Sequence, residues 1–405
     1  MSKEANKSTA ISILKKLRKA GYQSLFAGGC VRDMLLGSRP HDYDIATDAT
    51  PDDVANIFRR VIMVGAQFGV AMVMKKDRMC EVATFRNDDS YSDGRRPDSV
   101  TFSTPKEDAL RRDFTINGMF FDPVENKVID FVGGQKDLKK NIIRTIGNPN
   151  QRFAEDHLRI MRAIRFAARL NFKIESETFA AIKKFAPKII DISGERIFDE
   201  LFKMFTKDSA HFAFSQLYET KIAEHILPEL FQNKNQFEIS LKLLSLVSKF
   251  KNPVLNFGAI FFNLNKKQIK KIIRRLGQSN NLLRSLIYFI ENNSLWETVD
   301  SIELCDFKRL IANPDWILLH KLFRANEFLK TGKKTHSIRT AKRVNKIDPK
   351  LIAPKLFITG EDLKKLGLTE GKKLGSILRK LTDAQLNEEI KSKNQALKLA
   401  KDLVL

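Results

Sequence analysis

The chain has few cysteines and no long apolar run, and each of these absences argues against a class of protein. Only three cysteines occur in 405 residues, and no two of them form a C-x-x-C pair. We therefore expect neither a disulfide framework nor a zinc site. The amino end lacks an apolar segment for secretion, and no apolar stretch is long enough to span a bilayer. We expect a cytoplasmic protein without a membrane partner.

Acidic residues are scarce relative to basic ones. The chain has 48 Asp and Glu against 71 Lys and Arg, which gives a formal net charge of +23. Such an excess favours a polyanionic partner such as nucleic acid, although a lysine-rich surface also serves general solubility. Hydrophobic residues make up 43% of the chain, enough for packed cores, and the length predicts several domains.

A glycine turn near the amino end is the first candidate for a binding site. Residues 24–27 are typical of a short buried strand, and Gly28 and Gly29 let the backbone turn into an apolar helical run over residues 31–36. Gly37 is placed to end that helix. Backbone N–H groups at such a turn can bind an anion. The turn lacks the G-x-G-x-x-G order of a dinucleotide-binding fold.

Two carboxylates follow the turn. Asp42 and Asp44 lie two positions apart on a predicted second strand, so their side chains share one face. They would repel each other unless a divalent cation neutralised both, and magnesium prefers carboxylates together with phosphate oxygens and water. A β-hairpin is predicted from strands over residues 70–74 and 79–85. Its second strand carries Glu81, which could bring a third carboxylate beside the pair.

The order of these elements resembles a known family. The runs GGCVRDMLLG at residues 28–37 and DYDIAT at residues 42–47 resemble the first motif of the polymerase-beta-like nucleotidyltransferases of the bacterial class II kind. That family contains the CCA-adding tRNA nucleotidyltransferases and the bacterial poly(A) polymerases. The resemblance implies that Gly28, Gly29 and Arg32 hold a nucleoside triphosphate and that Asp42 and Asp44 bind two Mg²⁺ ions. It also implies that Glu81 deprotonates the terminal hydroxyl of an RNA primer.

Two further segments continue the resemblance. Residues 86–104 are too polar and glycine-broken for regular structure, and the run DGRRPD at residues 93–98 resembles the flexible loop of CCA-adding enzymes. An intact loop favours an enzyme that can add the terminal adenosine. The run RRDFTIN at residues 111–117 resembles the second family motif. It implies that arginine reaches the triphosphate, as a guanidinium fork suits phosphate, and that an acid and an amide lie near the sugar. The residues concerned are Arg111, Arg112, Asp113 and Asn117.

A helix is predicted over residues 155–169, where Asp156 and Arg159 would be neighbours on one face. Cytosine and adenine both present an amino donor beside a ring-nitrogen acceptor, so a carboxylate and an arginine could accept both bases. Uracil and guanine would leave buried groups unpaired at about 1–3 kcal/mol each. A plain helix salt bridge is the alternative interpretation. The run matches the family's nucleotide-recognition motif, which implies that Asp156 and Arg159 read the base and that Arg162 and Arg165 support nucleotide binding.

The remaining motifs point to support and to RNA contact. The run SGERI at residues 193–197 resembles the next family motif and is expected to brace the recognition helix. Residues 266–276 form a predicted amphipathic helix with a basic face, a candidate for phosphate contact. Residues 356–363 and 371–378 resemble the tail signature of CCA-adding enzymes, although Lys372 stands where family members usually have proline. The candidate RNA-binding residues are Lys270, Lys271, Arg274, Arg275, Lys372 and Lys373.

Together these features predict an α+β protein, with a small mixed-sheet nucleotidyltransferase head followed by an elongated all-α neck, body and tail. The expected parts are a catalytic head at residues 1–147, a neck with the nucleotide-recognition motif at 148–205, an RNA-binding body at 206–330 and a tRNA-binding tail at 331–405, which the polar stretch 331–355 separates from the body. The expected function is addition of CCA to the 3′ end of tRNA from CTP and ATP, with release of pyrophosphate; no DNA partner is expected. A bacterial poly(A) polymerase and an A-adding enzyme beside a separate CC-adding one are alternatives. An RNA-binding module without catalysis is disfavoured, because Asp42, Asp44 and Glu81 are all present.

Overall fold

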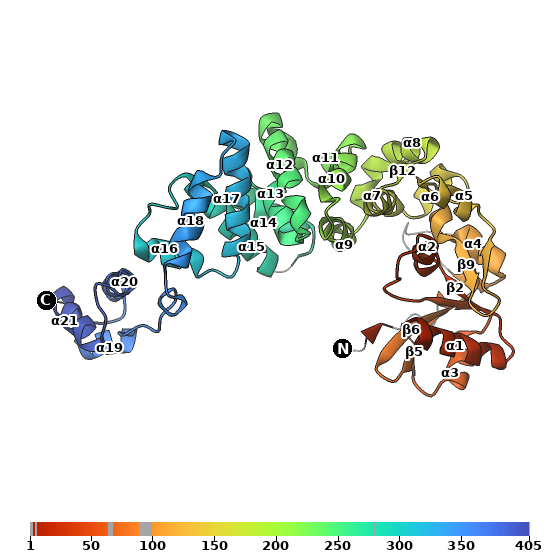
Figure 1. Cartoon of the computed structure of the whole chain (residues 1–405), viewed down its shortest axis with the longest axis horizontal. Coiled ribbons are helices and arrows are strands. Elements are labelled where there is room, and N and C mark those ends of the chain that lie inside the picture. The colour runs from red at the N-terminus through yellow and green to blue at the C-terminus, as the bar shows by residue number, and fades with distance from the viewer. Residues whose placement is uncertain (1–2, 5, 64–67, 89–98, 279, 405) are drawn as a thin grey trace. The chain divides into compact units, whose positions relative to one another are not determined.

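The computed structural model describes residues 3–4, 6–63, 68–88, 99–278 and 280–404. The chain forms two compact units, one of Met1–Phe231 with Arg275–Gly277 and one of Gln232–Arg274 with Gln278–Leu405 (Figure 1). The first unit carries a mixed sheet and the second is helical where it is described, so the α+β fold class is confirmed. The finer division at residues 147, 205 and 330 stays a prediction. Among the described residues no helix combines the length and apolar character needed to cross a membrane.

An eight-stranded mixed sheet forms the head of the first unit. Its strand order is β10-β9-β2-β3-β6-β5-β4, and β1 pairs with β6 off this path. The pairs β3–β6 and β1–β6 are parallel, whereas the other pairs are antiparallel. The strands are β1 Lys3–Glu4, β2 Ser24–Ala27, β3 Ile45–Thr47, β4 Val61–Ile62, β5 Val70–Lys75, β6 Arg78–Thr84, β9 Met119–Asp122 and β10 Lys127–Asp130. Two-stranded sheets are formed by β7 Arg86–Asp88 with β8 Val100–Phe102 and by β11 Ile142–Ile143 with β12 Lys173–Ile174.

The helices of the first unit lie between and after these strands. They are α1 Lys7–Lys19, α2 Gly29–Leu35, α3 Pro51–Ile57, α4 Pro105–Arg111, η2 Thr115–Asn117, α5 Gly134–Lys139, α6 Pro149–Glu155, α7 Arg159–Leu170, α8 Ser176–Phe185, η3 Ala186–Asp191, α9 Gly194–Phe205, α10 Ala210–Glu219, α11 Ile222–Ile226 and η4 Pro228–Gln232, where η marks a 3₁₀ helix. The start of α4 is fixed by a capping box, in which Thr104 and Glu107 satisfy each other's backbone N–H groups. By fixing the first residue of α4, the cap also determines the position of Arg111 and Arg112 at its other end.

Two predicted features near the glycine turn are confirmed. Strand β2 is buried at every residue, and α2 follows it directly. Gly37 has φ +72° just after the end of α2, the left-handed conformation that glycine adopts without strain. The predicted hairpin is also present, because β5 and β6 pair along their length from Val70↔Ala83 to Lys75↔Arg78.

Two local predictions in the head are wrong. Asp42 and Asp44 lie just before β3 rather than on a strand, because ladder pairing begins only at Ile45. Residues 86–104 are not irregular throughout, since β7 and β8 pair antiparallel with Asp88 opposite Val100. The strand pair is defined by backbone hydrogen bonds, and the polar side chains of this segment gave no hydrophobic pattern from which to predict it. The run at residues 93–98 lies outside the described residues.

The second unit is helical through its described residues. Its helices are α12 Lys234–Val247, η5 Ser248–Phe250, α13 Pro253–Ile260, α14 Lys266–Arg275 with its last residue in the first unit, α15 Asn280–Asn292, η6 Asn293–Glu297, α16 Leu304–Ile311, α17 Trp316–Thr331, α18 Thr335–Asn345, η7 Pro349–Leu351, α19 Gly360–Lys365, α20 Lys372–Leu386 and α21 Lys393–Val404. The tail helices α19, α20 and α21 share an apolar cluster centred on fully buried Leu363, Ala396 and Ala400.

The predicted amphipathic helix is confirmed as α14, whose buried residues are Ile269, Ile272 and Ile273. The polar stretch 331–355 is not only a separator, because it contains α18. This helix buries Ser337 and Thr340 rather than large apolar residues. The carboxylate of buried Glu327 on α17 accepts hydrogen bonds from the backbone N–H and hydroxyl of Ser337. Polar contacts therefore attach α18, which explains why its hydropathy gave no signal.

Candidate active site

One cavity of about 660 Å³ in the first unit collects the predicted nucleotide-binding residues. It lies where the turn before α2, the end of α4, η2 and α7 meet. Its lining includes Gly28, Gly29, Arg32, Asp42, Asp44, Arg111, Arg112, Asp113, Asn117, Asp156, Arg159, Arg162 and Arg165. The sequence motifs, spread over more than a hundred residues, are therefore brought to one place.

The glycine turn needs its glycine for two reasons. Gly28 has φ +71° and ψ −129°, a conformation that side-chain-bearing residues rarely adopt. A Cβ atom there would lie 3.0 Å from Nη1 of Arg112. The backbone N–H of Gly28 donates to the carbonyl of Met119 on β9 at 3.1 Å, which ties the turn to the sheet. The turn thus lets Arg112 approach the backbone at the start of α2.

The predicted carboxylates lie on or next to two adjacent parallel strands, with Asp44 just before β3 and Glu81 in the middle of β6. Ile45 on β3 pairs with Val82 on β6, so Asp44 and Glu81 each precede a paired residue and lie on the same face. Glu81 and Asp44 line a second cavity of about 240 Å³ together with Arg111 and Arg112. Asp44 lines both cavities. Mg²⁺ binds carboxylate oxygens together with phosphate oxygens, and arginine side chains bind phosphate. The carboxylates and arginines of these cavities therefore fit Mg²⁺ and a triphosphate.

A network of polar side chains joins the predicted phosphate and sugar residues. Arg32 is 2% exposed, and its Nη1 donates to the amide oxygen of Asn117 at 2.7 Å. The amide nitrogen of Asn117 donates to Asp113 at 3.1 Å, and Asp113 accepts from Nε and Nη2 of Arg162 at 2.9 and 2.7 Å. Burial alone would raise the pKa of Asp113, but the charge and hydrogen bonds of Arg162, with those of Asn117 and a backbone N–H, lower it to about 2. Asp113 therefore stays ionised.

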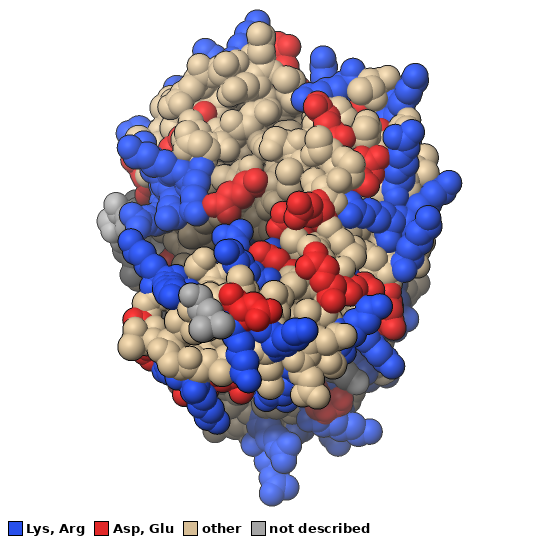
Figure 2. All heavy atoms as spheres, turned by 90° about the vertical axis from the view of Figure 1, so that its left-hand side faces the viewer, with Lys and Arg blue, Asp and Glu red and all other residues tan. Residues whose placement is uncertain are grey.

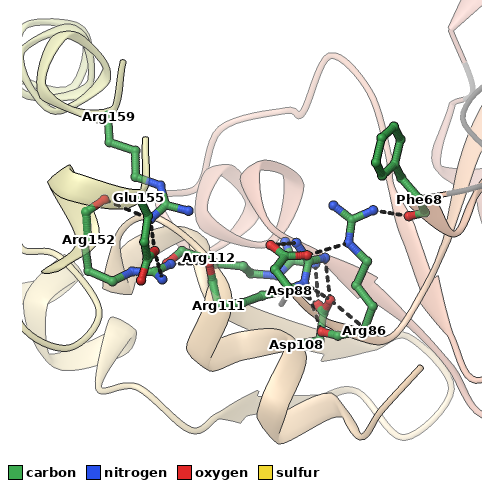
Figure 3. A network of polar contacts seen from close by, with 9 residues as sticks. All are labelled: Phe68, Arg86, Asp88, Asp108, Arg111, Arg112, Arg152, Glu155 and Arg159. Carbon is green, nitrogen blue, oxygen red and sulfur yellow. Dashed lines mark hydrogen bonds and ion pairs between the residues drawn. The ribbon is translucent and has the colours of Figure 1, made fainter. Parts of the chain in front are cut away.

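A second network orients the two arginines at the end of α4 (Figure 3). The side chain of Asp108 is 1% exposed and accepts from Arg111 at 2.6 Å and from Arg112 at 2.8 Å. Burial favours the neutral form of Asp108, yet the charges of Arg112 and Arg111 outweigh burial and keep its pKa below the usual value. Asp88 on β7 lies 3.4 Å from Arg111. These acids fix both guanidinium groups at the cavity wall.

The predicted helix over residues 155–169 is confirmed only from Arg159 onward, because the chain leaves helical geometry at Asp156. Helix α6 ends at Glu155, Asp156 has φ −144° and ψ 104°, and α7 begins at Arg159. The carboxylate of Asp156 accepts the backbone N–H of Leu158 at 3.0 Å, a local bond that replaces the helical one. Asp156 and Arg159 still line the same cavity, although they do not share a helix face.

The SGERI segment braces this junction as expected. Arg196 on α9 donates to the carboxylate of Asp156 at 3.2 Å. One turn further along α9, the buried Glu200 accepts from Nε of Arg165 at 2.6 Å. Burial lowers the pKa of Arg165, and Glu200 partly opposes this shift. Helix α9 therefore holds one predicted recognition residue and one predicted nucleotide-binding arginine.

Several lining residues were not predicted. The ring of Phe166 lies 5.3 Å from the guanidinium of Arg32, 5.4 Å from that of Arg162 and 4.3 Å from that of Arg165. An aromatic ring attracts a cation that lies over its face, so Phe166 helps to hold these arginines in place. The other lining residues outside the prediction are Asp33, His41, Asp88 and Arg169. Phe166 lies inside the recognition motif, so its position between arginines in the sequence could have identified it as a lining residue.

The predicted RNA-binding residues differ in how they are engaged. Lys270, Lys271 and Arg274 are exposed on α14, and Lys372 and Lys373 are exposed at the start of α20. Arg275 instead donates through both terminal nitrogens to Glu229 at 2.7 Å and to the carbonyl of Ile226 at 2.9 Å. Because this buried acid already pairs with its guanidinium, Arg275 is a poor candidate for phosphate contact.

Comparison with known families defines the class of protein. Residues 24–144, which include β2 to β10 and the three carboxylates, match the family model "Poly A polymerase head domain". Residues 171–233 match the model "Probable RNA and SrmB- binding site of polymerase A". The head has the fold of a nucleotidyltransferase, as the motifs predict.

Individual relatives narrow the class. A CCA-adding enzyme of Streptococcus suis is 32% identical over 393 residues, covering 96% of this chain and 94% of the relative. Poly(A) polymerase I of Salmonella typhi is 35% identical, but over 66% of this chain and 63% of the relative. The crystal structure of the Bacillus stearothermophilus CCA-adding enzyme in complex with CTP superposes with a TM-score of 0.75 at 28% identity, covering 97% of this chain and 96% of that one. The chain belongs to the family of CCA-adding enzymes and bacterial poly(A) polymerases.

Proposed function

We propose that this chain completes the 3′ end of tRNA by adding CCA from CTP and ATP, with release of pyrophosphate. The observation that carries this proposal is that one cavity is lined by Asp42, Asp44, several arginines and the candidate base-reading residues Asp156 and Arg159. The quoted CCA-adding relative aligns over 96% of the chain and the quoted poly(A) polymerase over 66%, which favours CCA addition. The cytoplasmic location expected from the sequence is part of the proposal.

The triphosphate would lie against the arginines at the end of α4. Arg111 and Arg112 each offer a planar guanidinium that Asp108 has already oriented, so little side-chain entropy is lost when phosphate binds. Asp42 and Asp44 would hold two Mg²⁺ ions, which when bound neutralise phosphate charge and favour the ionised form of the primer hydroxyl. Glu81, which lies beside Asp44 in the strand register, would accept the proton of that hydroxyl.

The sugar and the base would be read by groups that the protein holds in place. Asn117 donates one of its two amide hydrogens to Asp113, which leaves the other for a ribose hydroxyl. Asp156 accepts from Leu158 and Arg196 and retains lone pairs for the amino group of cytosine or adenine. Arg159, at the first residue of α7, would donate to the neighbouring ring nitrogen. Uracil or guanine would place like groups together, at about 1–3 kcal/mol for each unpaired group.

The deciding experiment uses purified protein and a tRNA trimmed to its discriminator base, offered CTP, ATP or both. The proposal requires two cytidines with CTP alone, and an adenosine only after both have been added. Unlimited adenosine on an unrelated RNA would identify a poly(A) polymerase. Adenosine added only to a tRNA that already ends in CC would identify an A-adding enzyme, and absence of any incorporation would contradict the enzymatic assignment.

A further inference from the structure

Arg152 on α6 is a buried arginine to which the proposed mechanism gives no role. Its side chain is 11% exposed. The Nη2 atom donates to the backbone carbonyl of Arg111 and, at 2.7 Å, to that of Arg112. These carbonyls lie at the carboxyl end of α4, where backbone acceptors lack partners within the helix. Arg152 therefore ties α6 to the backbone that carries both triphosphate-binding candidates.

The same guanidinium is also linked to Arg159, the arginine proposed to read the base, through Glu155 (Figure 3). Nη1 of Arg152 forms an ion pair with the carboxylate of Glu155, the last residue of α6. The same oxygen of Glu155 accepts from Nη1 of Arg159 at 2.6 Å. That Nη1 atom also donates to the backbone carbonyl of Arg152 at 3.0 Å. Contacts therefore run without a break from Arg112 through Arg152 and Glu155 to Arg159.

We propose that Arg152 is a positioning residue that sets the span between the arginines of the triphosphate and the arginine that reads the base. This inference rests on the proposed function. One nucleotide must satisfy both groups at once, and a misplacement of about 1 Å can cost about 10²-fold in rate. A planar guanidinium can bind two carbonyls and a carboxylate together, whereas an ammonium presents one point charge on a flexible stem. Charge alone is therefore insufficient at this position.

The test is Arg152→Lys, with kcat and KM measured for CTP, ATP and UTP on trimmed tRNA. We expect kcat/KM for CTP and ATP to fall by about tenfold or more, the preference for CTP over UTP to fall as well, and tRNA affinity to stay unchanged. The matched control is Arg18→Lys. Arg18 on α1 also donates to a backbone carbonyl, that of Ser24, and to a carboxylate, that of Asp122, but it does not line the cavity. This control should keep wild-type kinetics.

Base preference separates positioning from a purely structural role, which would lower the melting temperature and leave the CTP/UTP ratio intact. If Arg152→Lys does not fold, Glu155→Gln provides the test, because it removes the charge between Arg152 and Arg159 with little change in size. Wild-type kcat/KM and base preference in the variant that is measured would overturn the inference, as would an equal effect of Arg18→Lys. A wild-type protein that adds no nucleotide would instead overturn the proposed function.

Discussion

At the scale of single residues, the acids in and behind the cavity wall differ in burial. Asp108 and Asp113 are buried against arginines that keep them ionised. Asp42 is exposed and Asp44 half-buried, and both line the cavity. Their position at the cavity surface supports Asp42 and Asp44, rather than the two buried acids, as candidates for magnesium.

Asp42→Asn and Asp44→Asn should each lower nucleotide incorporation by about 10²-fold or more, since the amide keeps the shape but loses the charge that a divalent cation requires. The measurement is incorporation of CTP into trimmed tRNA, with tRNA affinity determined in parallel and expected to persist. Asp48→Asn is the matched control, because Asp48 is an exposed acid a few residues further along that does not line the cavity. Unchanged incorporation in Asp42→Asn would remove this residue from the site.

The pKa of Asp113 gives a prediction for stability. Its folded-state pKa of about 2 lies below the ordinary value of 3.8, so the ionised form stabilises the fold at pH values above 3.8. That contribution, about 2 kcal/mol, should be lost as the pH falls from about 3.8 toward 2. The free energy of unfolding in urea, followed from pH 6 to pH 2 for the wild type and Asp113→Asn, should show a difference that shrinks in that window. A difference independent of pH would contradict the assigned ion pair.

From the sequence, the residues that line the cavity could be predicted better than the residues that position their side chains. Motif order named most of the arginines and acids that line it, since their chemical type is visible in the sequence, but not Asp33, Asp88 and Arg169. Arg152 was missed because its carbonyl partners are distant in the sequence. It meets carbonyls 41 and 40 residues away. Nothing in local sequence encodes such a contact.

At the scale of elements, the turn between β2 and α2 is sensitive to a single added methyl group at Gly28. Gly28→Ala should destabilise the fold by about 1–3 kcal/mol, because it forces a side chain into a strained conformation. It should also lower CTP incorporation, since the Cβ would meet Arg112 at 3.0 Å. Both effects are measurable, by thermal unfolding and by kcat/KM for CTP.

Gly37→Ala is the control within the same element. Gly37 has a similar φ, +72°, but a Cβ there meets nothing within 4 Å. It should cost about 1 kcal/mol of stability and leave kcat/KM unchanged. Equal loss of activity in both variants would mean that backbone strain alone, and not the approach of Arg112, explains the effect of Gly28→Ala.

Element boundaries show where prediction from local pattern fails. Strand β2 and the hairpin of β5 and β6 were predicted well, because burial and turn residues mark them. The helix predicted over residues 155–169 begins only at Arg159, because helix propensity does not register that the Asp156 side chain accepts the N–H of Leu158. Helix α18 was missed because buried Ser337 is attached through Glu327 rather than through apolar contacts.

At the scale of the whole molecule, the net charge of +23 is a property of the entire chain, and charged side chains occur well beyond the cavity. Figure 2 shows basic side chains spread over the face that it draws and interleaved with acidic ones. A polyanion bound to such a surface releases counterions, so its affinity falls as salt rises. Net charge alone does not identify which residues bind the polyanion, and variants of equal charge are needed to do so.

The double variant Lys270→Gln with Arg274→Gln should weaken tRNA binding and reduce the slope of log affinity against log salt by about 0.7–0.9 for each phosphate that these side chains neutralise in the wild type. Both side chains are exposed on α14, whereas Arg275 is left in place because it pairs with Glu229. The control, Lys15→Gln with Lys19→Gln, removes the same charge from exposed residues of the head, outside the predicted RNA-binding body and tail. Equal slopes in the two double variants would mean that tRNA responds to total charge, and α14 would then have no claim to be an RNA-binding surface.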